Sequence, residues 1–400
     1  MIHGIWREVI LVVAAAPLVY YGAATVAALR FFWRERARKL PPFVPPVSLL
    51  KPVRGVGFGS HENFASFCRQ KYSDYEVLFA VNDADDPAVE VIRRIIAEFP
   101  ERRVRLLIGA EPRGANQKVS KLCRLAREAR HEILVLSDGD VRVGPEYLRE
   151  VVAPFADPHT GAVTCFYRGI AEKNSAAELE AIGASSDFFA GVLMAEWMEG
   201  MSFALGASIA TTKSWLGKIG GFEAIADMHS DDYELGHRIA LSGGRVILSR
   251  EAVWTMYPAQ TAQGFFDHQV RWARTLRLCR PMSYVGLLFT HGLPWALLAA
   301  VVAPVKWISA AYLAAYLVLR LIMAWVVGVW GVGDEVLRRK FWLVPLRDAV
   351  HFGIWLASFA SRRITWAGNE FEIRKRHMVA LDAAGAPETP APIGSGPAGG

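Results

Sequence analysis

Glu132-Ile-Leu-Val-Leu-Ser-Asp-Gly-Asp140 is the stretch that decides the fold. Its apolar run is short enough for a buried strand, and it ends in a turn that contains two aspartates. Similar short apolar runs alternate with segments of helical spacing on both sides, with strands expected at 47–53, 76–81, 104–108 and 162–167 and helices at 88–99, 117–130 and 145–155. This alternation predicts a mostly parallel α/β sheet, which binds ligands at the carboxyl ends of its strands.

An apolar segment precedes the predicted sheet. Residues 9–29 carry no charge, and about 20 residues in a helix span a bilayer core of about 30 Å. A secretory leader is the alternative, but the run is long and basic residues follow it at once, namely Arg30, Arg34, Arg36, Arg38 and Lys39. By the positive-inside bias, we expect the N-terminus to face outward and residues 33–280 to lie in the cytoplasm.

Further apolar segments follow the predicted sheet. Lys306 and Arg320 are the only charged residues in or between two stretches, 284–305 and 307–329, so both are predicted spans. An intramembrane charge such as Arg320 is a functional candidate, although it can also snorkel to the interface. Residues 341–361 are interrupted by an Arg-Asp pair and have basic flanks, which favours a re-entrant or interfacial segment.

The domain organisation follows from these segments. We expect an N-terminal transmembrane helix at 1–32, a catalytic α/β domain at 33–280 that ends in an interfacial helix, and transmembrane or re-entrant segments at 281–362. Residues 363–400 are predicted to be a basic and then disordered tail, because 381–400 are rich in Ala, Gly and Pro.

Composition narrows the class of partner. Hydrophobic residues make up 52% of the chain and the net charge is +6. Much of the positive charge lies beside apolar segments, so an anionic membrane surface is the expected partner rather than nucleic acid. The cysteines show no paired metal spacing and are expected to be reduced, structural thiols: Cys68, Cys123, Cys165 and Cys279.

The turn after the central strand is a candidate metal site. Asp138 and Asp140 stand two apart, and carboxylates in such a turn can converge on Mg²⁺ or Mn²⁺, which in turn can bridge a diphosphate. An ordinary Asp-Gly turn is the alternative. The strand context and the other motifs favour the metal site.

Two loops are candidate nucleotide-binding segments. Asp83 and Asp86 follow a strand and can accept hydrogen bonds from a base or ribose, or cap the next helix. Asn116 and Lys118 follow Gly114 at the start of a predicted helix, where a glycine turn, a helix N-terminus and a lysine favour an anion. A plain loop with a surface lysine is equally compatible with the second pattern.

Two later motifs are candidate catalytic elements. Asp232 is adjacent to Asp231 before a helix predicted at 233–241, so one acid can cap the helix while the other accepts a proton. Arg271 and Trp272 lie in a predicted helix, where an arginine suits a leaving diphosphate and a tryptophan can stack on a sugar. A basic amphipathic helix on the membrane surface is the alternative for the second motif.

Residues 188–209 are rich in Phe, Met, Ala and Trp, but Glu196 and Glu199 interrupt the run. The segment is too charged for a span. A buried helix followed by a strand is the favoured interpretation, and a surface that lies against the bilayer and admits a lipid is the alternative.

With these motifs in view, the chain resembles the ceramide glucosyltransferases of glycosyltransferase family 21, relatives of the inverting family 2, and in particular their bacterial members. The resemblance covers residues 9–376 and includes the following elements in order: Ser48-Leu49-Leu50-Lys51-Pro52, Asp83-Ala84-Asp85-Asp86-Pro87, Gly114-x-Asn116-x-Lys118, Asp138, Asp232 and Arg271-Trp272. Two positions depart from the pattern. His268 stands where the family has Gln or Arg, and Asp187 stands where the animal enzymes have a histidine tied to activity.

The resemblance implies a GT-A nucleotide-sugar domain held on the cytoplasmic face by transmembrane helices, in a bacterial inner membrane or, in a eukaryote, the Golgi or ER membrane. It implies an inverting transfer of a hexose from a UDP-sugar, UDP-glucose favoured, to ceramide. Carried over residue by residue, Asp232 is the base, Arg271 and Trp272 are catalytic, Asp138 and Asp140 hold Mn²⁺ or Mg²⁺, and Asp187 and His268 touch the acceptor. The same transfer implies that the donor is bound by Lys51, Asp83, Asp86, Asn116, Lys118 and Asp138.

Three alternatives stay open at this stage. A hopanoid or another lipid can replace ceramide as the acceptor. A processive polysaccharide synthase shares the aspartates and the Arg-Trp motif, although three spans and one doubtful segment are few for threading a polymer. A non-catalytic membrane protein that binds a nucleotide is the third, because folds outlive functions.

Overall fold

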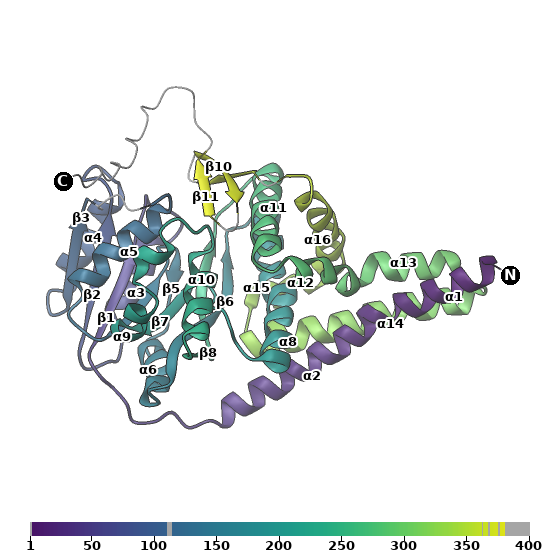
Figure 1. Ribbon diagram of the computed structural model, residues 1–400, viewed down its shortest axis with the longest axis horizontal. Helices are drawn as coiled ribbons and strands as arrows, with labels where there is room; N and C mark the ends of the chain where they lie inside the picture. The colour runs from purple at the N-terminus through teal and green to yellow at the C-terminus, as the bar shows by residue number, and fades with distance from the viewer. Residues whose placement is uncertain (1, 110–113, 362, 367–368, 375–376, 381–400) are drawn as a thin grey trace, which may run out of the picture.

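The computed structural model of the chain describes residues 2–109, 114–361, 363–366, 369–374 and 377–380. It consists of an α/β part and a helical part that extends from it, with the N-terminus at the far end of the helices (Figure 1). The membrane-spanning candidates are all in the helical part.

The α/β part is built on an eight-stranded sheet with the order β3-β2-β1-β4-β7-β6-β8-β5. Six strands run in one direction, while β7 and β5 are antiparallel to their neighbours. The predicted mostly parallel α/β sheet is therefore confirmed. The strands are β1 (Val47–Pro52), β2 (Tyr75–Val81), β3 (Arg103–Ile108), β4 (Ile133–Ser137), β5 (Val141–Arg142), β6 (Thr160–Ala171), β7 (Ser208–Thr212) and β8 (Arg245–Tyr257).

Helices cover both faces of the sheet and bury its apolar side chains. One core lies under α3 (Ser60–Cys68), α4 (Ala88–Glu98) and α6 (Tyr147–Val152) and extends to the helical part. The other lies under α5 (Gln117–Glu128), α9 (Lys213–Lys218) and α10 (Asp231–Leu241). Because both faces are covered, β1, β2 and β4 are buried along their whole length, as expected for parallel strands.

The segment 188–209 is a core helix followed by a strand, as the favoured interpretation predicted. It begins after α7 (Ser175–Gly183) and a π-helical turn, and it forms α8 (Phe189–Glu199) and then β7. The N-terminal half of α8 is buried, including Phe189 and Leu193. This segment therefore connects a helix that packs against α2 (Ala16–Ala37) to a strand of the sheet.

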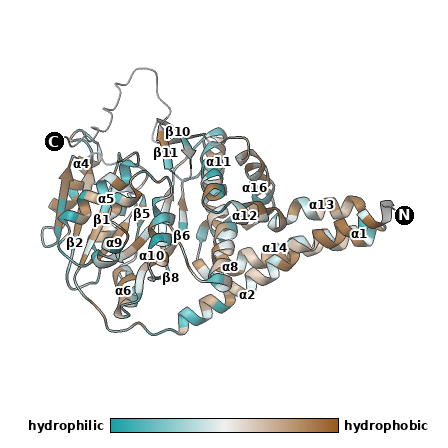
Figure 2. Cartoon of the chain, viewed as in Figure 1, coloured by the Kyte–Doolittle hydropathy of each residue, from teal (hydrophilic) through white to brown (hydrophobic). Residues whose placement is uncertain are grey.

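Two helices among the described residues are long and apolar enough to cross a membrane, by length and composition. They are Ile5–Ala37, which comprises most of α1 (Ile2–Ala14) and all of α2 (Ala16–Ala37), and Lys306–Val332, which contains α14 (Lys306–Ala324). They enclose the predicted spans 9–29 and 307–329. Figure 2 shows hydrophobic residues along these helices and hydrophilic ones at the end of α2 that meets the α/β part.

The predicted span 284–305 is not one straight helix. The chain forms a pair, Pro281–Thr290 and Gly292–Val302, bent by 48°. The break falls at His291, which is not helical, and Pro294 in the next turn has no N–H to continue an earlier helix. The pair is either a broken span or a re-entrant loop, so the span at 284–305 stays a prediction, and the bend is a feature that the sequence did not indicate.

The last apolar segment forms α16 (Val344–Ser358). Its 15 residues are fewer than the roughly 20 that a span needs. It packs against α11 (Ala262–Cys279) and α13 (Gly292–Val302). The re-entrant or interfacial position of this segment stays a prediction.

A small antiparallel sheet that was not predicted from the sequence follows α16. Its strands are β9 (Arg363–Trp366), β10 (Asn369–Arg374) and β11 (His377–Ala380). The backbone N–H of Met378 donates to the carbonyl of Asp227 at 2.8 Å, which ties this sheet to the loop before α10. The predicted disordered tail, 381–400, lies outside the described residues.

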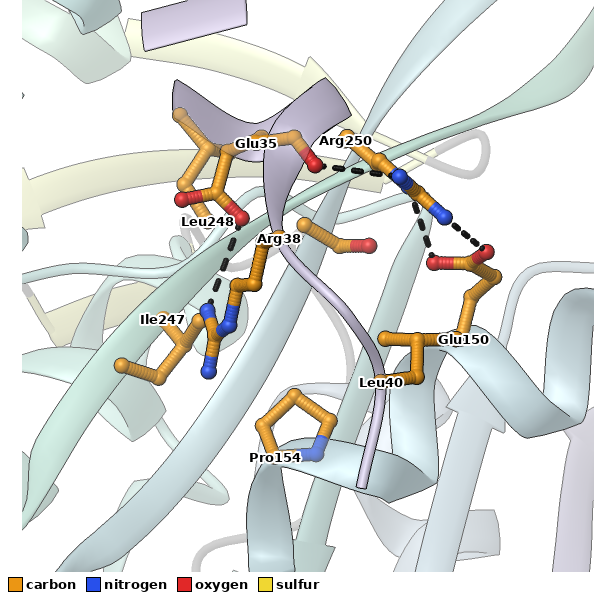
Figure 3. Close-up of a pocket in the computed structure, with 9 residues that line it drawn as sticks. Glu35, Arg38, Leu40, Glu150, Pro154, Ile247, Leu248 and Arg250 are labelled. Carbon is orange, nitrogen blue, oxygen red and sulfur yellow. Dashed lines mark hydrogen bonds and ion pairs between the residues drawn. The ribbon is translucent and has the colours of Figure 1, made fainter. Parts of the chain in front are cut away.

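An arginine joins the C-terminal end of α2 to the sheet (Figure 3). Arg250 of β8 donates to the backbone carbonyl of Glu35 at 3.0 Å and to the carboxylate of Glu150 in α6 at 2.7 and 3.2 Å. Arg38 also reaches the Glu35 carboxylate, at 3.5 Å. The candidate membrane helix α2 is thus attached to the α/β part by side chains from two elements of that part.

Candidate functional site

One cavity of about 880 Å³ extends from the carboxyl edge of the sheet to the apolar helices. At the sheet end it is lined by charged side chains: Lys118, Asp138, Asp140, Asp231 and Asp232. At the helical end the lining includes Tyr20, Tyr21, Leu293, Arg320, Met323 and Ile354. A polar site on the α/β part and the membrane-side helices therefore share one continuous space.

A lysine lies between two of the aspartate motifs. The Nζ of Lys118 is 2.8 Å from Asp138 Oδ1 and 3.1 Å from Asp231 Oδ2. Burial alone would lower the pKa of Lys118, but the carboxylates of Asp138, Asp231 and Asp232 raise it well above its usual value. The ammonium therefore stays charged in the first turn of α5 and faces the cavity.

Two other carboxyls titrate unusually high. Burial, followed by the neighbouring charge of Asp138, raises the pKa of Asp140 to about 6. Burial, followed by Asp231, raises the pKa of Asp232 to about 6. Asp140 is exposed but lines the cavity, where the surrounding protein atoms partly desolvate its carboxyl. Carboxyls with such pKa values are typical of proton-transferring or ligand-binding sites.

Ser230 precedes α10, and neither Asp231 nor Asp232 caps this helix with its side chain. Both instead lie in its first turn, which leaves the two carboxylates for the cavity and for Lys118. The capping alternative for these two acids is therefore not what the structure shows.

Lys51 lies behind the site. Its Nζ donates to the backbone carbonyl of Asp138 at 2.5 Å and lies 3.9 Å from the ring centroid of Phe67. Burial lowers its pKa to about 7, although Asp140 and Asp138 act in the opposite direction. Lys51 is not among the cavity-lining residues, so its place in the structure is that of a support for the aspartate turn.

Asn116 is also a supporting residue. Its side chain caps α5 by accepting from the backbone N–H of Lys118 and Val119 at 3.0 and 3.2 Å. Its amide donates to the carbonyl of Met228 at 2.9 Å and reaches Asp231 at 3.4 Å. This buried side chain therefore fixes the start of α5 against the loop before α10.

Gly114 permits the same junction. It has φ +69°, and a Cβ there would lie 2.5 Å from the carbonyl oxygen of Ala226. Only glycine combines this conformation with such a close approach. The two loops that carry Lys118 and Asp231 are thereby held together.

The first aspartate motif lies outside the cavity lining. Asp86 accepts from the backbone N–H of Gly55 at 3.0 Å and from that of Ala88 at 2.8 Å, so it caps α4 and holds the loop after β1. Asp83 is exposed. Arg54, next to the held glycine, lines the cavity instead. The structure thus places Asp86 as an anchor for the loop that carries Arg54.

The residues predicted on α11 face the cavity. Arg271 makes no hydrogen bond through its guanidinium to any described residue, and burial lowers its pKa. Trp272 is 40% exposed and meets the ring of His268 edge to face, with centroids 5.8 Å apart. The guanidinium and the indole are therefore both available to a ligand.

Asp187 and Arg320 belong to one buried network at the helical end of the cavity. Arg320 pairs with Asp187 and donates to both carboxylate oxygens of Asp348, at 3.0 Å from Nε. Tyr316 donates to Asp348 at 2.8 Å. The second oxygen of Asp187 lies 3.7 Å from Nδ1 of His351. The arginine in the span is thus neutralised by two carboxylates.

The aspartates offer few ligands for a resident metal. Among the described residues, no group of three or more His, Cys, Asp and Glu side chains could hold a metal ion. Asp138 and Asp140 supply the hard oxygen donors that Mg²⁺ or Mn²⁺ prefers. Burial is the larger cause of the raised pKa of Asp140, and the neighbouring charge of Asp138 adds to it. The pair therefore fits a cation whose other ligands come from a diphosphate or water.

Several cavity residues escaped the sequence analysis. Arg54 and Lys121 add positive charge at the sheet end, while Tyr257, Glu180 and Arg347 line the middle and the helical end. Glu180 follows no strand and belongs to no motif. The ends of β8 and α7 lie close in sequence to the predicted motifs, and this closeness is the only signal for Tyr257 and Glu180. The sequence does not show which side chains of these elements point into the cavity.

The geometry agrees with comparisons with known proteins. A family model described as glycosyl transferase family 21 matches residues 9–379. The chain belongs to glycosyl transferase family 21. Ceramide glucosyltransferase 1 of Caenorhabditis elegans is 25% identical over 247 residues, which covers 58% of the family 21 chain and 50% of the relative. The ceramide glucosyltransferase of Komagataella phaffii is 27% identical over 143 residues, which covers 35% and 27%.

A solved structure supports the fold assignment. The mannosyltransferase PcManGT from Pyrobaculum calidifontis, in complex with GDP-Man and Mn²⁺, superposes with a TM-score of 0.50 at 19% identity and covers 87% of this chain and 99% of its own. The α/β part of this family 21 protein has the GT-A fold predicted from its motifs. The chain spans about half the length of the first curated relative that it matches.

Proposed function

We propose that this family 21 protein is a membrane-bound inverting glycosyltransferase. It moves a hexose from a UDP-sugar, with UDP-glucose favoured, to a hydroxyl of a membrane lipid, with ceramide as the favoured acceptor. The observation that carries the proposal is the single cavity that extends from the aspartates to the apolar helices. A donor and a lipid can meet in it without the lipid leaving the bilayer, and the ceramide glucosyltransferase relatives support this acceptor.

The donor binds at the sheet end of the cavity. Lys118 and Arg271 contact the diphosphate, because both are cationic, line the cavity and come from different elements. Fixed positive charge at the leaving diphosphate stabilises the charge that develops as the sugar departs. Asp86 acts on the nucleotide side through the loop that carries Arg54, rather than by lining the cavity, and the exposed Asp83 is left as a contact for the base or ribose.

Asp138 and Asp140 would hold the divalent cation. When bound, this cation neutralises part of the charge on the diphosphate. The chain contributes the position of the two carboxylates, because Lys51 holds the backbone of the Asp138 turn from behind.

Asp232 takes the proton from the lipid hydroxyl. The hydroxyl oxygen forms a bond to the anomeric carbon from the face opposite the diphosphate, and the bond to the diphosphate oxygen breaks with its electron pair. A pKa of about 6 lets Asp232 be ionised at neutral pH and still be a better base than an ordinary aspartate. The cytoplasm is the expected location of this site, since basic residues end α2 on that side.

The test uses membranes of a host that lacks glycolipids. We expect the wild-type protein to transfer label from UDP-glucose to ceramide, and Asp232→Asn to abolish transfer while UDP-glucose binding survives. Label on a hopanoid alone would keep the reaction and change the acceptor. An active Asp232→Asn variant would remove the base assignment, and label in a long polymer would replace the lipid transferase by a polysaccharide synthase.

A further inference from the structure

A carboxylate–imidazole pair lies in the cavity outside the residues that act on the donor. His268 Nδ1 is 2.6 Å from Glu180 Oε1, and Gln260 donates to the other Glu180 oxygen at 2.5 Å. The three side chains come from α7, from the segment after β8, and from α11. Side chains from two other segments therefore converge on the buried carboxylate of α7.

The pair has a fixed orientation. The Glu180 side chain is only 6% exposed, whereas that of His268 is 34% exposed and lines the cavity. Burial alone would raise the pKa of Glu180, but the hydrogen bonds from His268 and Gln260 and nearby positive charge hold it below its usual value. The ionised carboxylate therefore accepts a hydrogen bond from Nδ1–H of His268, and Nε2 makes no hydrogen bond to any described residue.

The position of His268 places this nitrogen on the acceptor side. His268 lies one helical turn before Arg271 and Trp272 on the same face of α11, about 5 Å along the helix axis. Its neighbour Gln269 accepts a hydrogen bond from Arg347 of α16 at 2.8 Å, and Arg347 belongs to the helical end of the cavity. His268 is therefore located between the diphosphate contacts and the membrane-side helices.

We propose that Glu180, Gln260 and His268 form an acceptor subsite in which Nε2 of His268 binds a second polar group of the lipid, a hydroxyl or amide N–H that does not react. This inference rests on the proposed lipid transfer and names a feature of its acceptor. In the neutral ring, Nε2 is a hydrogen-bond acceptor, so the lipid must supply the donor. A lipid whose reacting hydroxyl is its only donor would leave this position unpaired.

The experiment compares two acceptors. A short-chain ceramide carries an amide N–H and a second hydroxyl, whereas 1,2-diacylglycerol has one hydroxyl and no amide. We expect His268→Phe to raise the KM for ceramide by roughly 3- to 10-fold, the effect of one lost hydrogen bond, and to leave the KM for UDP-glucose unchanged. The preference for ceramide over diacylglycerol should shrink by the same factor, and Glu180→Gln should do the same more weakly.

Two controls separate a contact from a structural role. His268→Gln keeps a hydrogen-bonding side chain and should retain part of the preference. Asp267→Asn changes an exposed carboxylate on the same helix, paired with Gln263 at 2.9 Å, and should change nothing. Equal falls in kcat for both acceptors, with KM and preference intact, would overturn the subsite.

Failure of the subsite and failure of the proposed function give different results. Transfer by the wild type with an unchanged preference in His268→Phe removes the subsite alone. If the wild type labels neither lipid, the proposed transfer to these lipids fails, and saturation binding of tritiated short-chain ceramide then decides the subsite. Binding weakened in His268→Phe but not in Asp267→Asn supports it, whereas equal binding by all variants overturns it.

Discussion

A single methyl group near the proposed base would test its position. Gly206 lies just before β7, and a Cβ built on it would be 2.7 Å from Oδ2 of Asp232 and 3.3 Å from its Cγ. These distances are shorter than van der Waals contact, so Gly206→Ala must displace the Asp232 carboxyl. The aspartate itself is kept, with its charge and its place in α10.

The expected loss follows from the displacement. To restore an ordinary contact of about 3.5 Å, the Asp232 oxygen has to move by roughly 1 Å. A misplacement of this size costs about 10²-fold in rate, which corresponds to about 2.7 kcal/mol in the activation free energy. The stability cost is expected at the low end of the roughly 1–3 kcal/mol for overpacking, because the carboxyl can turn toward the cavity.

The assay measures kcat for lipid glycosylation, the Kd for UDP and thermal unfolding of the purified protein. Gly217→Ala is the matched control, since nothing lies within 4 Å of a Cβ on this helical glycine of α9. The control should keep kcat and gain up to about 1 kcal/mol in stability. A folded Gly206→Ala protein with wild-type kcat would refute the argument that the position of Asp232 limits the reaction.

Two other outcomes follow from the charges and contacts of the site. Because burial raises the pKa of Asp232 to about 6, kcat/KM should fall about tenfold per pH unit below about pH 6. A pH–rate profile of the wild type measures this fall, and any residual activity of Asp232→Asn should not show it. The same shift has the opposite sign for stability: the folded state holds a proton that the unfolded chain releases, so this contribution to the unfolding free energy grows as pH falls from about 6 toward about 4. Arg250→Ala should cost about 1–2 kcal/mol of unfolding free energy, because it removes a charge-assisted contact to Glu150 and a partner of the Glu35 carbonyl. Arg245→Ala, which removes an exposed ion pair on the same strand, should cost at most about 1 kcal/mol, and equal losses in chemical denaturation would contradict the role of the junction.

The sequence predicted the sheet because its periodicity is local. Continuous apolar runs such as 133–137 are what a strand buried on both faces requires, and they stand between helical patterns. The three-stranded sheet formed by β9, β10 and β11 was missed because its strands are only four to six residues long and the segment is rich in charged residues. The break at His291 was missed for a different reason: hydropathy sums over a window and does not register a bend.

The site was predicted in part. The sequence did not distinguish the residues that line the cavity from the residues that hold them in place. Motifs identified the cavity residues Lys118, Asp138 and Asp232, but they did not separate these from the residues that hold them. Lys51 and Asp86 have the same polar character, yet they bond to backbone groups behind or beside the cavity. The direction in which a side chain points depends on packing between segments that are distant in the chain. This information cannot be read from a single sequence.

The departure from the family pattern at position 187 is explained by a charge elsewhere in the chain. An arginine in a membrane span is costly unless it is paired, and Arg320 is buried against both Asp187 and Asp348. Removing one partner of a buried pair typically costs about 3–5 kcal/mol. An Asp187→His exchange would therefore remove a carboxylate from Arg320 as well as change the cavity wall. A loss of activity in Asp187→His would therefore not separate the loss of the ion pair from the change in the cavity wall. An acceptor contact at position 187 can be tested only by a variant that keeps the charge, such as Asp187→Glu.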